Sequence, residues 1–165
     1  MKGFDQKKCV DFKIIFALVV KMSSIRVVLG LAASLNLEIE QLDIKTTFLH
    51  GDLEEEIYME QPEGFSVKGK LVCKLKKSLY ELKQASRQWY KKFNFFMENY
   101  GFNKTICNDC VFVKKFSDND FIILLLYVDD MLIVSHDANK IDNLKKSLAS
   151  LLQLRTWDRQ NRFLA

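Results

Sequence analysis

The chain has 165 residues, 48% of them hydrophobic, which suffices for one domain with a sizeable core and excludes an intrinsically disordered chain. Its formal net charge of +4 is too small to indicate a polyanionic partner by itself. No apolar run is long enough to span a bilayer, and no convincing secretory signal is present. We therefore expect no membrane contact and a reducing compartment.

The first half of the chain combines a helix, strands and two blocks of charge. A helix capped by Ser23 or Ser24 is predicted from a stripe of apolar residues: Val28, Leu31, Ala32 and Leu35. Strands are predicted over 37–47 and 71–75. Residues 46–67 carry six acids and no Lys or Arg, whereas residues 68–92 carry nine basic residues and one acid, Glu81. Such a basic block is typical of a solvated face, and less often of a surface that contacts phosphates.

The second half alternates helices and strands. A helix over 78–100, with Gly101 as its stop, is predicted from a second stripe: Leu82, Ala85, Trp89, Phe93 and Phe96. Strands follow over 111–116, 121–127 and 131–134, and a third helix opens at Asp137, with Ile141, Leu144, Leu148 and Leu151 on its apolar face. This order predicts an α+β fold, an antiparallel sheet with helices packed on one face.

The cysteines Cys107 and Cys110 have the spacing of half a zinc site. Since no second Cys or His pair completes such a site, we expect buried, reduced thiols rather than a metal centre.

Two adjacent aspartates stand in the apolar segment "FIILLLYVDDMLIVS", residues 121–135. The strands on either side of Asp129 and Asp130 predict a tight hairpin, and Asp tolerates the positive φ of such turns. Both carboxylates then leave the sheet at one end, where Mg²⁺ can bind them. Asp43, in another apolar strand, would complete a two-metal site for phosphoryl transfer. An ordinary polar turn with an unrelated edge aspartate is the alternative.

The tetrapeptide Tyr127-Val128-Asp129-Asp130 resembles the signature of reverse transcriptases. Longer stretches are similar to the polymerase of copia-type retrotransposons: "LDIKTTFLHGDLEEEIYMEQPEGF" (42–65), "LVCKLKKSLYELKQASRQWYKKF" (71–93) and "FIILLLYVDDMLIV" (121–134). The resemblance covers about residues 2–150. It implies a palm with partial fingers, acting as an RNA-directed DNA polymerase on an RNA or DNA template–primer with deoxynucleotide triphosphates. It also implies a cytoplasmic location in virus-like particles, with the nucleus as an alternative.

The same resemblance implies roles for individual residues. Asp43, Asp129 and Asp130 correspond to the catalytic carboxylates, which bind two Mg²⁺ ions, with Mn²⁺ as a substitute. Phe48 corresponds to the aromatic residue that screens the 2′ position of the incoming sugar, and Gln84 to a glutamine that contacts the nucleotide. The basic residues expected at the template–primer backbone or the triphosphate are Lys74, Lys76, Lys77, Lys83 and Arg87. The alternative for each is an ordinary solvent-facing side chain.

Several positions depart from the family pattern. The family has Gly at Glu81 and Pro at both Ser86 and Leu18, and its basic fingers segment would precede residue 1. Residues 151–165 do not continue the pattern either. Codon degeneracy permits Arg155–Leu164 to be encoded by AGG ACT TGG GAC CGG CAA AAC AGA TTC TTG. Read from the third base, the same bases encode Asp-Leu-Gly-Pro-Ala-Lys-Gln-Ile-Leu, which fits the family.

We therefore expect partial fingers and palm over 1–150 and a frameshifted tail over 151–165. The primer grip, thumb and RNase H domain would then be missing, and the polymerase would be weakly active or inactive. A nucleic-acid-binding remnant without catalysis and a decayed reading frame are the alternatives.

Overall fold

The computed structural model describes residues 19–44, 47–62, 64–65, 72–117 and 119–152. Among these residues, 47–93 form a smaller compact unit, and 19–44 together with 94–152 form a larger one. No helix in the described ranges is long and apolar enough to cross a membrane.

The larger unit is built on a five-stranded sheet in which every neighbouring pair is antiparallel. The strands, in spatial order, are β1 (Glu38–Asp43), β7 (Asp130–Ser135), β6 (Phe121–Tyr127), β5 (Asn108–Lys115) and β4 (Asn103–Thr105). The predicted α+β class with an antiparallel sheet is therefore confirmed. The first strand is shorter than predicted, because it ends at Asp43 and a 3₁₀ turn, η2 (Thr47–His50), follows.

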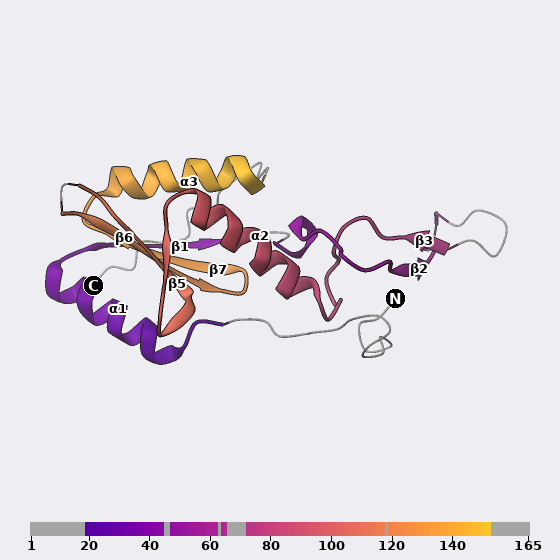
Figure 1. Cartoon of the computed structure of the whole chain (residues 1–165), viewed down its shortest axis with the longest axis horizontal. Helices are drawn as coiled ribbons and strands as arrows, with labels where there is room; N and C mark the ends of the chain where they lie inside the picture. The colour runs from indigo at the N-terminus through magenta and orange to yellow at the C-terminus, as the bar shows by residue number, and fades with distance from the viewer. Residues whose placement is uncertain (1–18, 45–46, 63, 66–71, 118, 153–165) are drawn as a thin grey trace. The chain divides into compact units, whose positions relative to one another are not determined.

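Helices α1 (Met22–Leu35) and α3 (Ala138–Leu152) cover opposite faces of this sheet (Figure 1). Ile39 and Gln41 line a cavity together with residues of α1, whereas Glu40 accepts a hydrogen bond from Lys145 of α3. Alternate residues of a strand point to opposite faces. The prediction of helices on one face is therefore wrong. The central strand β6 is apolar on both faces, and both need cover.

The predicted face and cap of α1 are only partly right. Val28 and Ala32 are buried, but Leu35 is exposed. The N-cap is Lys21, which makes no side-chain capping bond, rather than Ser23 or Ser24.

Helix α2 (Ala85–Asn99) begins later than its apolar stripe predicts. Glu81 has a left-handed backbone, φ 71°, and the Ser78 N–H donates to the Gly51 carbonyl, so the preceding residues are held outside a helix. The predicted stop is confirmed. Gly101 has φ 83°, and the N–H of Phe102 donates to the Met97 carbonyl at 2.9 Å, which is the Schellman arrangement.

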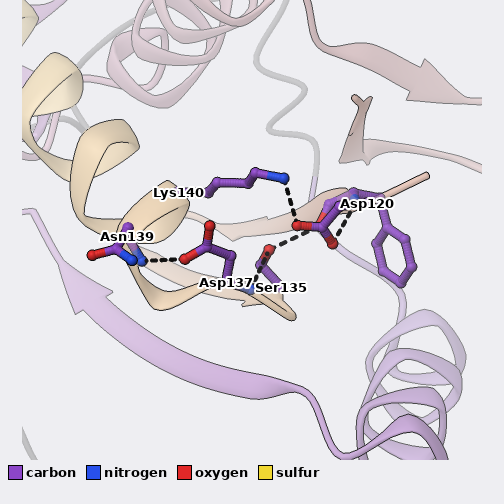
Figure 2. Close-up of polar contacts among 6 residues, drawn as sticks. Asp120, Ser135, Asp137, Asn139 and Lys140 are labelled. Atoms are coloured by element: carbon purple, nitrogen blue, oxygen red, sulfur yellow. Dashed lines mark hydrogen bonds and ion pairs between the residues drawn. The ribbon is translucent and has the colours of Figure 1, made fainter. Parts of the chain in front are cut away.

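A polar network closes the end of the β6–β7 hairpin that lies away from its turn (Figure 2). The Ser135 hydroxyl donates to the Phe121 carbonyl at 2.9 Å, and the Lys140 ammonium donates to Asp120 at 2.7 Å. Asp137 caps α3 as predicted, because its Oδ1 accepts the Asn139 N–H at 2.8 Å. Ile141, Leu144 and Leu148 are buried as predicted, while the side chain of Leu151 lies outside the described residues. These bonds tie α3 to the hairpin and hold its register.

The smaller unit contains η2, a two-stranded antiparallel ladder of β2 (Tyr58–Glu60) and β3 (Val72–Lys74), and the first part of α2. Ile57, Leu82 and Ala85 form its buried cluster, and Phe48 and Leu53 are among the partly buried residues packed against it. Strands β2 and β4 were not predicted, because each has only three residues and no clear alternation.

Candidate functional site

The β6–β7 hairpin turns in two residues, Val128 and Asp129, since Tyr127 pairs with Asp130. Val128 has φ 57°, a left-handed conformation that β-branched residues rarely adopt. The prediction that an aspartate takes the positive φ is therefore wrong. Such a backbone costs about 1–3 kcal/mol, and the two flanking strands must hold it in place.

The backbone positions of the candidate aspartates lie together at one end of the sheet. Asp43, the last residue of β1, is the cross-strand partner of Asp130, the first residue of β7. The Ile44 N–H donates to the Asp129 carbonyl at 3.1 Å, which fixes the turn against the end of β1. Directly opposed residues of antiparallel strands have Cα atoms about 4.5–5.5 Å apart. The three aspartates therefore occupy neighbouring backbone positions.

The side chains of the three aspartates lie farther apart than their backbone positions suggest. Asp43 and Asp130 are exposed, and Asp129 is half-buried with a buried Oδ1 atom. No three His, Cys, Asp or Glu side chains in the described part of the chain lie close enough together to hold a metal ion. Carboxylate oxygens are nevertheless the donors that Mg²⁺ prefers, so the residue types fit such an ion. Binding would require these side chains to rotate toward one another.

Gln41 is a member of this site that the sequence reasoning missed. Its Nε2 donates to Oδ1 of Asp130 at 3.3 Å. Gln41 lies two residues before Asp43, and residues at this spacing share one face of a strand. The spacing of two residues between Gln41 and Asp43 was the sequence feature that could have placed Gln41 on the same strand face as Asp43. Beside these residues, the sheet and α1 line an open, mostly apolar pocket of about 430 Å³, whose polar lining residues are Gln41, Tyr127 and Asp130.

Phe48 and Gln84 belong to the smaller unit, whereas the three aspartates belong to the larger one. The Phe48 ring is partly buried and meets the Tyr80 ring edge-on, with centroids 5.0 Å apart. Gln84 is 1% exposed, so any contact with a nucleotide requires its side chain to become accessible.

The acidic and basic blocks of the sequence pair with each other. The Lys77 ammonium contacts Asp52 at 2.5 Å, and Lys74 forms an ion pair with Glu56. Among the other basic candidates, Lys76 is exposed, and Lys83 and Arg87 are half-buried. The basic block is therefore not the uniformly open face that its composition suggests, and two of its predicted nucleic-acid contacts already hold a carboxylate.

The two cysteines of the zinc-like spacing differ in environment. Cys107 is exposed, contrary to the expectation of a buried thiol, whereas Cys110 is buried. Burial, followed by the charge of Asp109, raises the pKa of the Cys110 thiol to about 11.

With this geometry in view, the whole chain, residues 1–165, matches the family described as reverse transcriptase (RNA-dependent DNA polymerase). The chain belongs to the reverse transcriptase family. It is 63% identical over 157 residues to the Retrovirus-related Pol polyprotein from transposon TNT 1-94 of Nicotiana tabacum, a match that covers 94% of this chain and 12% of that one. It is 36% identical over 165 residues to the corresponding polyprotein from transposon RE1 of Arabidopsis thaliana, covering 99% and 11%.

These relatives confirm the expected copia-type retrotransposon reverse transcriptase. A third relative, the Truncated transposon Ty1-A Gag-Pol polyprotein of Saccharomyces cerevisiae, is 38% identical over 112 residues, 67% of this chain and 9% of that one. No solved structure matches the chain. The reverse transcriptase chain thus spans about a tenth of the length of the polyproteins that it matches.

The frameshifted tail predicted for this reverse transcriptase stays a prediction. Helix α3 continues to Leu152, and residues 153–165 lie outside the described residues. Sequencing the gene beyond codon 165 tests the prediction, which fails if neither alternative frame continues as polymerase.

Proposed function

We propose that the chain forms the nucleotidyl-transfer centre of a copia-type RNA-directed DNA polymerase, with the larger unit as palm and the smaller unit as partial fingers. The observation that carries this proposal is the pairing of Asp43 with Asp130, next to the turn that holds Asp129. In the reaction, a primer 3′-hydroxyl attacks the α-phosphate of a deoxynucleotide triphosphate. A phosphodiester bond forms, and pyrophosphate leaves with the electron pair of the broken bond.

Asp43, Asp129 and Asp130 would hold two Mg²⁺ ions, for which Mn²⁺ can substitute. When bound, the ions neutralise charge on the attacking and leaving oxygens. The chain itself contributes the position of the carboxylates: β1 and β7 fix Asp43 and Asp130, and the hydrogen bond from Gln41 orients Asp130. A ligand oriented by such a partner binds its metal more tightly.

The remaining predicted roles belong to the same proposal. Phe48 would limit the space at the 2′ position of the sugar, and Gln84 would contact the nucleotide. Lys76, Lys83 and Arg87 would contact the phosphates of an RNA or DNA template–primer together with Lys74 and Lys77.

A second candidate is a remnant that binds nucleic acid without catalysis. It is favoured by the separation of the aspartate side chains, which leaves no group of three carboxylates in the described residues close enough to hold a metal ion.

A primer-extension assay with Mg²⁺ or Mn²⁺ tests the first proposal. We expect the wild-type chain to extend a labelled primer weakly, Asp129→Asn and Asp43→Asn to abolish extension, and Glu38→Gln, at the far end of β1, to retain the wild-type level. Extension that survives Asp129→Asn would contradict the site. A wild-type chain that binds the template–primer but never extends it would favour the remnant.

A further inference from the structure

Three carboxylates form an outward-facing strip on the smaller unit. Asp52, Glu54 and Glu56, named here the acidic strip, are all exposed. The residues between them face inward to different degrees: Leu53 packs against the buried cluster, and Glu55 is half-buried. Ile57, which follows the strip, is 2% exposed. Packing of the intervening residues therefore fixes the direction of the three carboxylates.

Each carboxylate of the acidic strip holds a lysine from another part of the unit. Glu56 pairs with Lys74 of β3, Asp52 with Lys77, and Glu54 with Lys91 of α2. Lys92 adds a longer contact of 4.0 Å to Asp52. The four cations form one surface, named here the lysine face: Lys74, Lys77, Lys91 and Lys92. Three carboxylates from one stretch of the sequence thus contact four lysines from another.

The pairs are ionised at neutral pH, because the pKa of each carboxyl group is lowered, which favours its charged form. The hydrogen bond from Lys77 holds the pKa of Asp52 below its usual value of 3.8, and the hydrogen bond from Lys91, then that from Gln88, lowers the pKa of Glu54. The hydrogen bond from Lys74, followed by that from Tyr58, lowers the pKa of Glu56. A carboxylate in this position presents a lysine with the same kind of charged oxygen acceptor as a backbone phosphate.

The pairs are also open to exchange. The side chains of the three closest pairs are 41–69% exposed, and ion pairs with this much solvent contact are individually weak. A phosphate can therefore replace a carboxylate without opening the core of the unit.

We propose that the acidic strip is an internal competitor of nucleic-acid phosphates for the lysine face, so that binding there exchanges carboxylates for phosphates. This inference rests on the proposed role of the chain in nucleic-acid binding and adds a surface, Lys91 and Lys92, to it. When a phosphate replaces a carboxylate on a lysine, the phosphate releases its bound cations, but the freed carboxylate attracts cations from the solvent. Fewer cations are therefore released in total than when a phosphate binds a lysine that has no carboxylate partner. A nucleic acid is consequently held more loosely, which suits a strand that must move past the surface.

The test measures the affinity of the full chain for a short fluorescein-labelled single-stranded DNA by anisotropy, between about 50 and 200 mM NaCl. The strip variant is Asp52→Asn/Glu54→Gln/Glu56→Gln. Its matched control is Glu38→Gln/Glu60→Gln/Glu98→Gln, which removes the same formal charge from other exposed positions. In a third protein, Lys74→Gln/Lys77→Gln/Lys91→Gln is added to the strip variant.

We expect the strip variant to bind about tenfold more tightly than wild type at low salt. We also expect the slope of log affinity against log salt to steepen by about two, from three phosphates at about 0.7 each. The control should gain less affinity and keep the wild-type slope, and the third protein should lose the gain. Equal slopes for wild type and the strip variant overturn this inference alone. If no variant binds the DNA, the proposed function falls as well.

Discussion

Asp43 lies directly opposite Asp130 where β1 ends and β7 begins. Like charges at directly opposed positions destabilise an antiparallel pair of strands. The hydrogen bond from Gln41 to Asp130 offsets part of this repulsion, and a divalent cation would offset more. The chain therefore retains an unfavourable pair at the position where the proposed chemistry needs it.

The repulsion predicts that Asp43→Asn stabilises the fold when metal is chelated. We expect the free energy of unfolding in EDTA to rise by about 0.5 kcal/mol, measured by urea denaturation. Adding Mg²⁺ should stabilise the wild type and leave Asp43→Asn little changed, since only a bound ligand shifts the equilibrium. Glu38→Gln, opposite the uncharged Ser135, is the control. Equal Mg²⁺ stabilisation of wild type and Asp43→Asn would contradict the role of Asp43.

The left-handed backbone of Val128 predicts a second effect on stability. Asn tolerates this conformation better than a β-branched residue, so Val128→Asn should raise the free energy of unfolding by about 1 kcal/mol. Val128→Thr keeps the β-branch and the approximate size, and it should leave the urea midpoint unchanged. If both variants behave alike, the strain at the turn is not stored in the Val128 backbone.

Two glycines provide a matched pair of substitutions. Gly101 has φ 83° after α2, and an added Cβ would meet only Lys114 at an ordinary distance of 3.7 Å, so the cost of Gly101→Ala is backbone strain of about 1 kcal/mol. Gly30 lies inside α1 with nothing within 4 Å of an added Cβ. Gly30→Ala should therefore stabilise the chain by about 0.5–1 kcal/mol. Thermal unfolding should move in opposite directions for the two variants, and a common direction would contradict this explanation.

Lys145 predicts a loss of stability in alkali. Burial alone would lower its pKa, but hydrogen bonds from its ammonium to Glu40 and Asp142 outweigh burial and raise the pKa above the ordinary 10.5. The stabilisation is complete below 10.5. As the pH rises further, the unfolded chain loses this proton first, so stability falls until the folded lysine has also deprotonated.

The matched variant is Lys145→Arg, whose guanidinium stays charged over this range. Urea unfolding measured from pH 9 to pH 12 should show a steeper decline for the wild type than for Lys145→Arg. Parallel declines would mean that other groups account for the alkaline instability.

Sequence patterns predicted those features that depend on nearby residues. Apolar runs located β6 and β7, and Asp137 and Gly101 marked helix ends that the structure confirms. Features set by distant parts of the chain were missed. The start of α2 depends on a hydrogen bond from Ser78 to Gly51. The acidic and basic blocks form their ion pairs only after the smaller unit has folded.

The candidate site shows the same division. The doublet in the hairpin turn could be predicted from its neighbours, since apolar residues flank it on both sides. The partnership of Gln41 with Asp130 could not, because it depends on the register between two strands far apart in sequence. Register follows from the whole set of facing side chains rather than from any one of them.

The sheet order has a consequence for synthesis on the ribosome. β1 pairs with β7 within the described sheet, and the contact between Gln41 and Asp130 joins residues 89 positions apart. At about 5–20 residues per second, β1 waits on the order of ten seconds for its partner to be translated. An unpaired strand in that interval is a template for aggregation. A ribosome that stalls before the β6–β7 turn therefore carries a nascent chain with a bare sheet edge and one aspartate of the three.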